Sequence, residues 1–163
     1  MITRRIFLVG AVPLLSACLP VIGSIPHPKI TSIEVFKADR VMNLLSYGIP
    51  VRQYEIDLGS DPVGHKRQRG DGKTPEGVYH ITHVNTQSRF TLSLGINYPN
   101  ARDLQTSAAA GVDPGDDIFI HGLPNGYGSA VPDWTNGCVA VGNTEITEIV
   151  SMVAPGTPIT IYP

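Results

Sequence analysis

The chain has 163 residues, which is enough for one domain with a sizeable core. Hydrophobic residues make up 42% of it, and 17 Gly and 14 Pro indicate a globular, loop-rich protein and not a disordered one. The net charge is −2 without a basic stripe, which argues against a nucleic-acid partner. The two cysteines, Cys18 and Cys138, are too few for a disulfide framework.

The first 17 residues indicate an export signal. Arg4 and Arg5 precede an apolar run over residues 6–17. A helix of that length rises only about 18 Å, well short of a hydrocarbon core of roughly 30 Å. The run therefore predicts a signal peptide over residues 1–17 and not a membrane-spanning helix.

Cys18 ends this signal in the sequence Leu15-Ser16-Ala17-Cys18, which resembles a bacterial lipobox. The resemblance implies a lipidated Cys18 at the mature N-terminus of an exported, periplasmic envelope protein; the alternative is an ordinary small core residue. More than one acyl chain would anchor the protein stably to a membrane. Leu19, in place of Asp, would permit sorting to the outer membrane. Residues 18–29 are rich in proline and predict a flexible tether.

Residues 30–163 form the predicted domain, which is mainly β with short helices. Alternating apolar residues predict half-buried strands over residues 30–37 and 49–58. Further strands are predicted over residues 41–47, 77–84, 90–94, 118–122, 139–141 and 158–162.

Two helices complete the domain. Alanines over residues 101–110 predict the first helix. An apolar stripe predicts the second over residues 143–154, with Asn143 as its N-cap and Pro155-Gly156 as its end.

The glycine-rich segment over residues 64–77 resembles a phosphate-binding loop only superficially. A Walker A motif needs Gly five positions before Gly72, where Arg67 stands. The β-like residues 78–84 also argue against the helix that must follow such a loop. Turn chemistry explains the Gly, Asp and Pro residues, so nucleotide binding is rejected.

The histidines do not predict a metal site. His80 and His83 differ by an odd number of positions along a strand, so their side chains face opposite ways. A zinc ion on His121 and Cys138 would lack obvious third and fourth ligands. We expect neither a metal nor another cofactor.

Two short segments hold the candidate chemistry. Residues 118–122 and 139–141 predict buried strands, and the Gly/Pro/Asn-rich loop between them can bring His121 and Cys138 together. A thiol needs a base within hydrogen-bond reach to form a thiolate at neutral pH, and imidazole is the usual partner. Gly137 permits a positive φ just before the sulfur, so that backbone N–H groups can meet a developing oxyanion.

These residues match the signature of a known family. The signature is a His-Gly pair, a gap, and then Ser/Thr-x-Gly-Cys, and this chain has His121-Gly122 and Thr135-Asn136-Gly137-Cys138. The domain thereby resembles the L,D-transpeptidase catalytic (YkuD-type) family from about residue 30 to the C-terminus. The variant Asp133-Trp134-Thr135 resembles the branch that includes murein peptide amidases. The resemblance implies an L,D-transpeptidase-type mixed β-sandwich.

The matched residues acquire roles from this resemblance. Cys138 would be the nucleophile and His121 the general base and later the acid. Supporting residues would be Gly122 and Thr135. The backbone groups of the oxyanion site would be those of Asn136, Gly137 and Cys138. Candidate walls of the cleft are His65, Tyr98, Trp134 and Tyr127, although core packing is the safer interpretation of each aromatic residue and a surface role is the alternative for His65.

One position departs from the family pattern. Many members have Arg two residues after the cysteine, where this chain has Ala140. A cation there can meet a substrate carboxylate. Arg52, Arg89 or Arg102 could supply one from elsewhere, and the sequence selects none of them.

Three functions therefore stay open. The leading one is a cysteine-dependent L,D-transpeptidase that acts on peptidoglycan stem peptides through a thioester. It would form meso-diaminopimelate cross-links or attach a lipoprotein to the wall. The second is an L,D-amidase that hydrolyses such attachments, and the third is a non-catalytic wall-binding lipoprotein. We expect a monomer whose partners are stem peptides and, through Cys18, a membrane.

Overall fold

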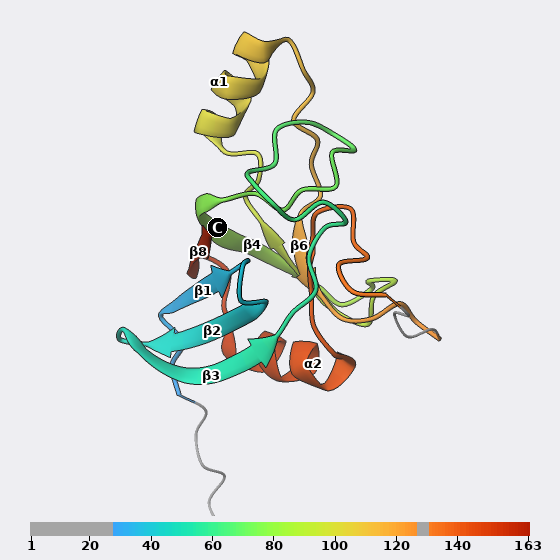
Figure 1. Cartoon of the computed structure of the whole chain (residues 1–163). Helices are drawn as coiled ribbons and strands as arrows, with labels where there is room; N and C mark the ends of the chain where they lie inside the picture. The colour runs from blue at the N-terminus through green and yellow to red at the C-terminus, as the bar shows by residue number, and fades with distance from the viewer. Residues whose placement is uncertain (1–27, 127–130) are drawn as a thin grey trace, which may run out of the picture.

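The computed structural model describes residues 28–126 and 131–163, so the expectations for the export signal, Cys18 and Tyr127 lie outside the described residues. The described residues form one eight-stranded mixed sheet and two short helices (Figure 1). The strands lie in the order β3-β2-β1-β8-β4-β5-β6-β7. The predicted class, mainly β with short helices, is confirmed.

The first three strands form an antiparallel meander at one edge of the sheet. They are β1 (Ser32–Phe36), β2 (Val41–Ser46) and β3 (Ile49–Glu55). Buried and partly exposed residues alternate along β1, as they do in a strand with one face on the core.

The last strand of the chain joins the two halves of the sheet. β8 (Pro158–Tyr162) pairs parallel with β1 and antiparallel with β4 (Gly77–Asn85). Ile159 and Ile161 on β8 are buried in the core. The C-terminus therefore ties the first meander to the half of the sheet that carries the candidate site.

β5 (Ser93–Ile96) begins later than the sequence predicts. The expected start at Phe90 was wrong because Thr91 has a φ of 67°, a left-handed conformation that does not fit a strand. β5 pairs antiparallel with β6 (Phe119–His121), and β6 pairs parallel with β7 (Val139–Ala140).

The sheet curls so that its two edges meet. The predicted strand over residues 49–58 ends at Glu55, but the chain beyond it still pairs with the opposite edge. Asp57 N–H donates to Ala140 O at 2.9 Å, and Ala140 N–H donates to Asp57 O at 2.8 Å. A second bridge joins Gly59 to Thr135. The curl thus brings the end of β3 against the segment that carries Cys138.

Both predicted helices are present and lie at opposite ends of the sheet (Figure 1). α1 (Ala101–Ala110) begins with a capping box between Asn100 and Asp103, and Gly111 ends it in a left-handed conformation. α2 (Asn143–Met152) buries Ile146 and Ile149. No helix in the described parts of the chain is long and apolar enough to span a bilayer.

The predicted N-cap of α2 was wrong. The N-cap residue is Gly142, which has no side chain to cap the helix, and Asn143 is the first residue of the helix. The Asn143 side chain instead accepts a hydrogen bond from Leu123 N–H at 2.8 Å. The Asn143 side chain therefore binds the loop after His121 and does not cap its own helix.

Lys37 anchors the loop that precedes β4. Its Nζ donates to the carbonyl oxygens of Gly64 at 2.7 Å and Thr74 at 3.0 Å, and to Glu76 Oε1 at 2.7 Å. Burial lowers the pKa of Lys37, and the Glu76 carboxylate opposes that shift. The segment over residues 64–77 is a surface loop held by a buried cation, and β4 follows it in place of the helix of a phosphate loop.

Candidate active site

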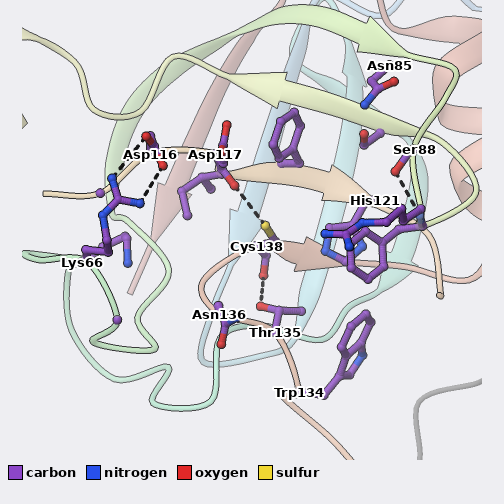
Figure 2. Close-up of a pocket in the computed structure, with 18 of the residues that line it drawn as sticks. Lys66, Asn85, Ser88, Asp116, Asp117, His121, Trp134, Thr135, Asn136 and Cys138 are labelled. Carbon is purple, nitrogen blue, oxygen red and sulfur yellow. Dashed lines mark hydrogen bonds and ion pairs between the residues drawn. The ribbon is translucent and has the colours of Figure 1, made fainter.

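β6 and β7 present the two candidate catalytic side chains to one cleft. His121 on β6 pairs with Ala140 on β7, and Cys138 immediately precedes β7. Paired residues share a face of a sheet and side chains alternate along each strand, so Cys138, two positions before Ala140, lies on the His121 face. Both side chains line a cleft of about 770 Å³ (Figure 2).

His121 is only 3% exposed, and its imidazole packs against two aromatic rings that also contact each other. Its centroid is 4.5 Å from the Phe90 ring and 5.5 Å from the Trp134 ring. Nδ1 lies 2.7 Å from the carbonyl oxygen of Gly122, which can only accept, so Nδ1 carries the proton. Burial lowers the pKa of His121, against the opposing effect of the Gly122 carbonyl. His121 is therefore neutral at neutral pH, with Nε2 unprotonated.

Cys138 carries a protonated thiol. Its Sγ donates to the carbonyl oxygen of Asp117 at 3.5 Å (Figure 2). Burial raises the pKa of Cys138 to about 11, although the Phe119 N–H and the charge of Lys66 act in the opposite direction. The sequence predicts a thiolate next to the imidazole, whereas this geometry gives a neutral pair at neutral pH. The thiol proton must then leave as the sulfur reacts.

Thr135 shapes the turn that presents the sulfur. Its hydroxyl donates to Cys138 O at 2.8 Å and accepts from Gly137 N–H at 3.1 Å. Gly137 has a φ of 123°, and a Cβ there would lie 2.5 Å from Lys73 O, so this position requires glycine. The Gly137 N–H already donates to Thr135, so it is not available to an oxyanion. The remaining expected donors are the N–H groups of Asn136 and Cys138. Neither makes a backbone hydrogen bond within residues 28–126 and 131–163.

Asp133 ties the same turn to the other edge of the sheet. Its carboxylate accepts from Arg40 Nη2 at 2.7 Å and from Leu58 N–H at 3.0 Å. Burial alone would raise the pKa of Asp133, but the hydrogen bonds from Arg40 and Leu58 outweigh it and hold the pKa below its ordinary value. Asp133 is therefore an ionised anchor for the cysteine turn.

Of the expected cleft walls, Trp134 lines the cleft and contacts His121 edge-on. Tyr98 does not line it. The Tyr98 ring packs at 6.1 Å from the Tyr79 ring, and its hydroxyl donates to Pro114 O at 2.9 Å. Tyr98 is a core residue.

His65 also lies outside the cleft wall. Its Nδ1 accepts from Glu76 N–H at 2.9 Å, and its Nε2 lies 3.4 Å from Asp103 Oδ1. Both ring nitrogens thus hold the loop before β4 against the start of α1.

The structure distinguishes the three arginines that could replace a cation at position 140. Ala140 itself is buried against Asp57. Arg52 pairs with Glu148 at 2.8 Å, and neither Arg52 nor Arg102 lines the cleft. Arg89 lines it and makes no ion pair with any residue in the described ranges.

Within the described ranges, no three His, Cys, Asp or Glu side chains lie close enough together to hold a metal ion.

A cysteine and a histidine face one cleft from neighbouring segments, and this is the pair of side chains that thiol-dependent acyl transfer uses. Residues 30–161 match the L,D-transpeptidase catalytic domain family, YkuD. The chain belongs to this family, which confirms the resemblance drawn from the His-Gly and Thr-x-Gly-Cys motifs.

The proteins that this chain resembles are longer than the region that matches. YafK of Escherichia coli (strain K12), whose assignment as an L,D-transpeptidase is provisional, is 30% identical over 146 residues, which cover 80% of this chain and 53% of YafK. The structure of Bdellovibrio bacteriovorus Bd1075 is 26% identical with a TM-score of 0.61, covering 82% of this chain and 48% of that chain. Pgp2, the helical cell shape determining protein of Campylobacter jejuni, shares the fold with a TM-score of 0.65 at 22% identity, covering 83% of this chain and 47% of Pgp2. This chain thus spans about half the length of these relatives.

Proposed function

We propose that this chain is a cysteine-dependent L,D-transpeptidase that acts on peptidoglycan stem peptides through a thioester acyl-enzyme. The observation that carries the proposal is that Cys138 and His121 face one cleft, with the imidazole proton directed to the Gly122 carbonyl. Membership in the L,D-transpeptidase family supports the substrate class.

The first half of the reaction forms the thioester. His121 Nε2 takes the thiol proton as Sγ attacks the carbonyl carbon of the donor peptide. The N–H groups of Asn136 and Cys138 donate to the oxyanion, a contribution of about 3–4 kcal/mol per donor. The intermediate collapses, the C–N bond breaks, and the departing amine takes the proton from the His121 imidazolium.

The second half depends on the acceptor. An amine acceptor attacks the thioester carbonyl, loses its proton to His121 and leaves a new amide, while the thiol regains a proton. Water in the same place releases a free acid. Because the resting thiol is protonated, the neutral His121 acts as a true general base in the first step.

A second candidate, an L,D-amidase that hydrolyses diaminopimelate-linked attachments, is favoured by the Asp133-Trp134-Thr135 sequence. Both activities share the thioester and differ only in the acceptor. The third candidate, a wall-binding protein without turnover, would need no reactive thiol.

One experiment separates the three. The full chain is incubated with purified sacculi, and muropeptides are measured by mass spectrometry. New dimers support transfer, while released peptides without dimers support the amidase. We expect Cys138→Ser to fold and to lose turnover and the covalent carbapenem adduct. Wild-type turnover in Cys138→Ser would contradict the nucleophile, and absence of both products and adduct in the wild type would leave only wall binding.

We also propose that a lipid on Cys18 holds the protein in the bacterial envelope. The lipobox-like sequence that ends at Cys18 is its support. Metabolic labelling with a fatty-acid analogue, compared between wild type and Cys18→Ser, tests the anchor: equal labelling would contradict it.

A further inference from the structure

One peptide group beside the candidate base is held at both ends. The carbonyl oxygen of Gly122 lies 2.7 Å from His121 Nδ1, and the N–H of Leu123 donates to Asn143 Oδ1 at 2.8 Å. These two atoms belong to the same planar peptide unit. The orientation that satisfies Asn143 therefore also directs the carbonyl at the imidazole.

Asn143 Oδ1 is itself fixed by a second donor. Thr91 Oγ1 donates to it at 2.9 Å, while Thr91 N–H donates to Asn125 Oδ1 at the same distance. Thr91 holds a φ of 67°, which is costly for a β-branched residue. Strained backbone of this kind persists where surrounding contacts over-determine it, and it gathers at functional sites.

Gly122 is the residue that permits this close approach. A Cβ at position 122 would come within 2.7 Å of Asn143 Oδ1 and 2.9 Å of Phe90 O. The glycine after the catalytic histidine thus leaves room for the Asn143 amide, and its φ lies outside the left-handed region.

Helix capping does not account for the Asn143 side chain. Gly142 is the N-cap of α2, and the Asn143 amide oxygen is turned to Leu123 and Thr91, both outside the helix. Nor is Asn143 a wall of the cleft, so it does not touch a bound peptide there.

We propose that Asn143 is a positioning residue that sets the tautomer of His121 through the Gly122–Leu123 peptide. With the proton on Nδ1, the lone pair lies on Nε2, the nitrogen that must take the thiol proton. Without the Asn143 acceptor the Gly122–Leu123 peptide loses the hydrogen bond that fixes its orientation, the Gly122 carbonyl is held less firmly against Nδ1, and His121 also populates the tautomer protonated on Nε2. The inference rests on the proposed function for its catalytic consequence, but the tautomer is a property of the free protein.

The test compares Asn143→Ala with Asn143→Asp and with Thr147→Ala. Asp keeps an oxygen acceptor for Leu123 N–H. Thr147 lies on the same helix, and its exposed hydroxyl donates only to Asn143 O, so Thr147→Ala controls for a general weakening of α2. Each variant is labelled with ¹⁵N, and His121 spectra are recorded above the ordinary histidine pKa of about 6.5.

In wild type, Asn143→Asp and Thr147→Ala we expect a protonated Nδ1 and an unprotonated Nε2. In Asn143→Ala we expect a mixture of the two tautomers. Its kcat should fall about 10–100-fold, the range found when outer hydrogen-bond partners of metal-ligating histidines are removed, with KM little changed. A wild-type tautomer and kcat in Asn143→Ala would overturn the proposal, and so would an equal loss in Thr147→Ala.

Two provisions keep the test decisive. If Asn143→Ala fails to fold, Asn143→Leu removes the acceptor and keeps the branching at Cγ, and a wild-type His121 spectrum in that variant overturns the proposal. If the wild type acts on no muropeptide, the proposed function fails, but the tautomer comparison needs no substrate and still decides the role of Asn143.

Discussion

Arg40 and Asp133 are 93 positions apart in the chain, yet Arg40 Nη2 lies 2.7 Å from Asp133 Oδ2. The pair joins the start of β2 to the turn that leads into Cys138. Leu58 N–H donates to the same carboxylate, so one side chain links the two edges of the curled sheet. The position of the nucleophile therefore depends on a contact far from it in sequence.

We expect Asp133→Asn to lower the free energy of unfolding by about 1.5–3 kcal/mol, the range for hydrogen bonds to charged groups. Acylation of Cys138 by a carbapenem should also slow, because the turn loses its anchor. Urea unfolding and mass spectrometry of the adduct measure the two effects. Asp61→Asn is the matched control, since its ion pair with Lys73 is at the surface, with Asp61 59% exposed, and contributes at most about 1 kcal/mol. Equal losses in both variants would contradict the anchoring role.

The sequence was sufficient to bring His121 and Cys138 to one cleft, because local patterns carry that prediction: apolar runs predict the two strands, and the glycines mark where the backbone must turn. It could not show that Asp133 meets Arg40, since nothing local relates residues on opposite edges of a sheet before the curl is known. Asn143 was misassigned for the same reason. An Asn at a helix start predicts a cap, and only the fold places Leu123 and Thr91 beside it.

Other parts of the site carry no sequence signal at all. The carbonyl of Asp117 that accepts from the thiol is a backbone group, which any residue would supply. Phe90 packs at a tilt against His121 where the chain leaves strand geometry at Thr91, whereas the apolar pattern favours a strand there. The raised pKa of Cys138 likewise follows from burial, which requires the tertiary structure.

The thiol of Cys138 should titrate far above an ordinary cysteine. Burial raises its pKa to about 11, so we expect its rate of alkylation by iodoacetamide to keep rising with pH up to that value. Peptide mass spectrometry separates Cys138 from Cys18, and a cysteine in an unstructured reference peptide should level off near 8.5. Circular dichroism over the same range checks that the fold persists. A plateau for Cys138 at neutral pH would mean that a thiolate is the resting state.

The buried imidazole of His121 should make stability depend on pH. Burial lowers its pKa below the value of 6.5 in the unfolded chain, so the unfolded state binds a proton more readily. This contribution to stability is complete above pH 6.5 and is lost as the pH falls toward the lowered pKa of the folded state. Urea unfolding at a series of pH values should show a smaller decline for His121→Gln than for wild type. Parallel curves would show that His121 takes up its proton equally well in the folded protein.

Arg89 should recognise a carboxylate on the donor peptide. Arg89 lines the cleft and makes no ion pair with another described residue, and guanidinium groups bind carboxylates through paired hydrogen bonds. We expect Arg89→Gln to raise KM about tenfold, equivalent to about 1.4 kcal/mol, with little change in kcat. The sharper measurement compares a donor with a free terminal carboxylate and the same donor amidated: wild type should prefer the acid, and Arg89→Gln should lose that preference. Arg52→Gln removes the same group from a position outside the cleft and should leave KM unchanged. If Arg89→Gln raised KM equally for the acid and the amidated donor, Arg89 would have a structural role instead.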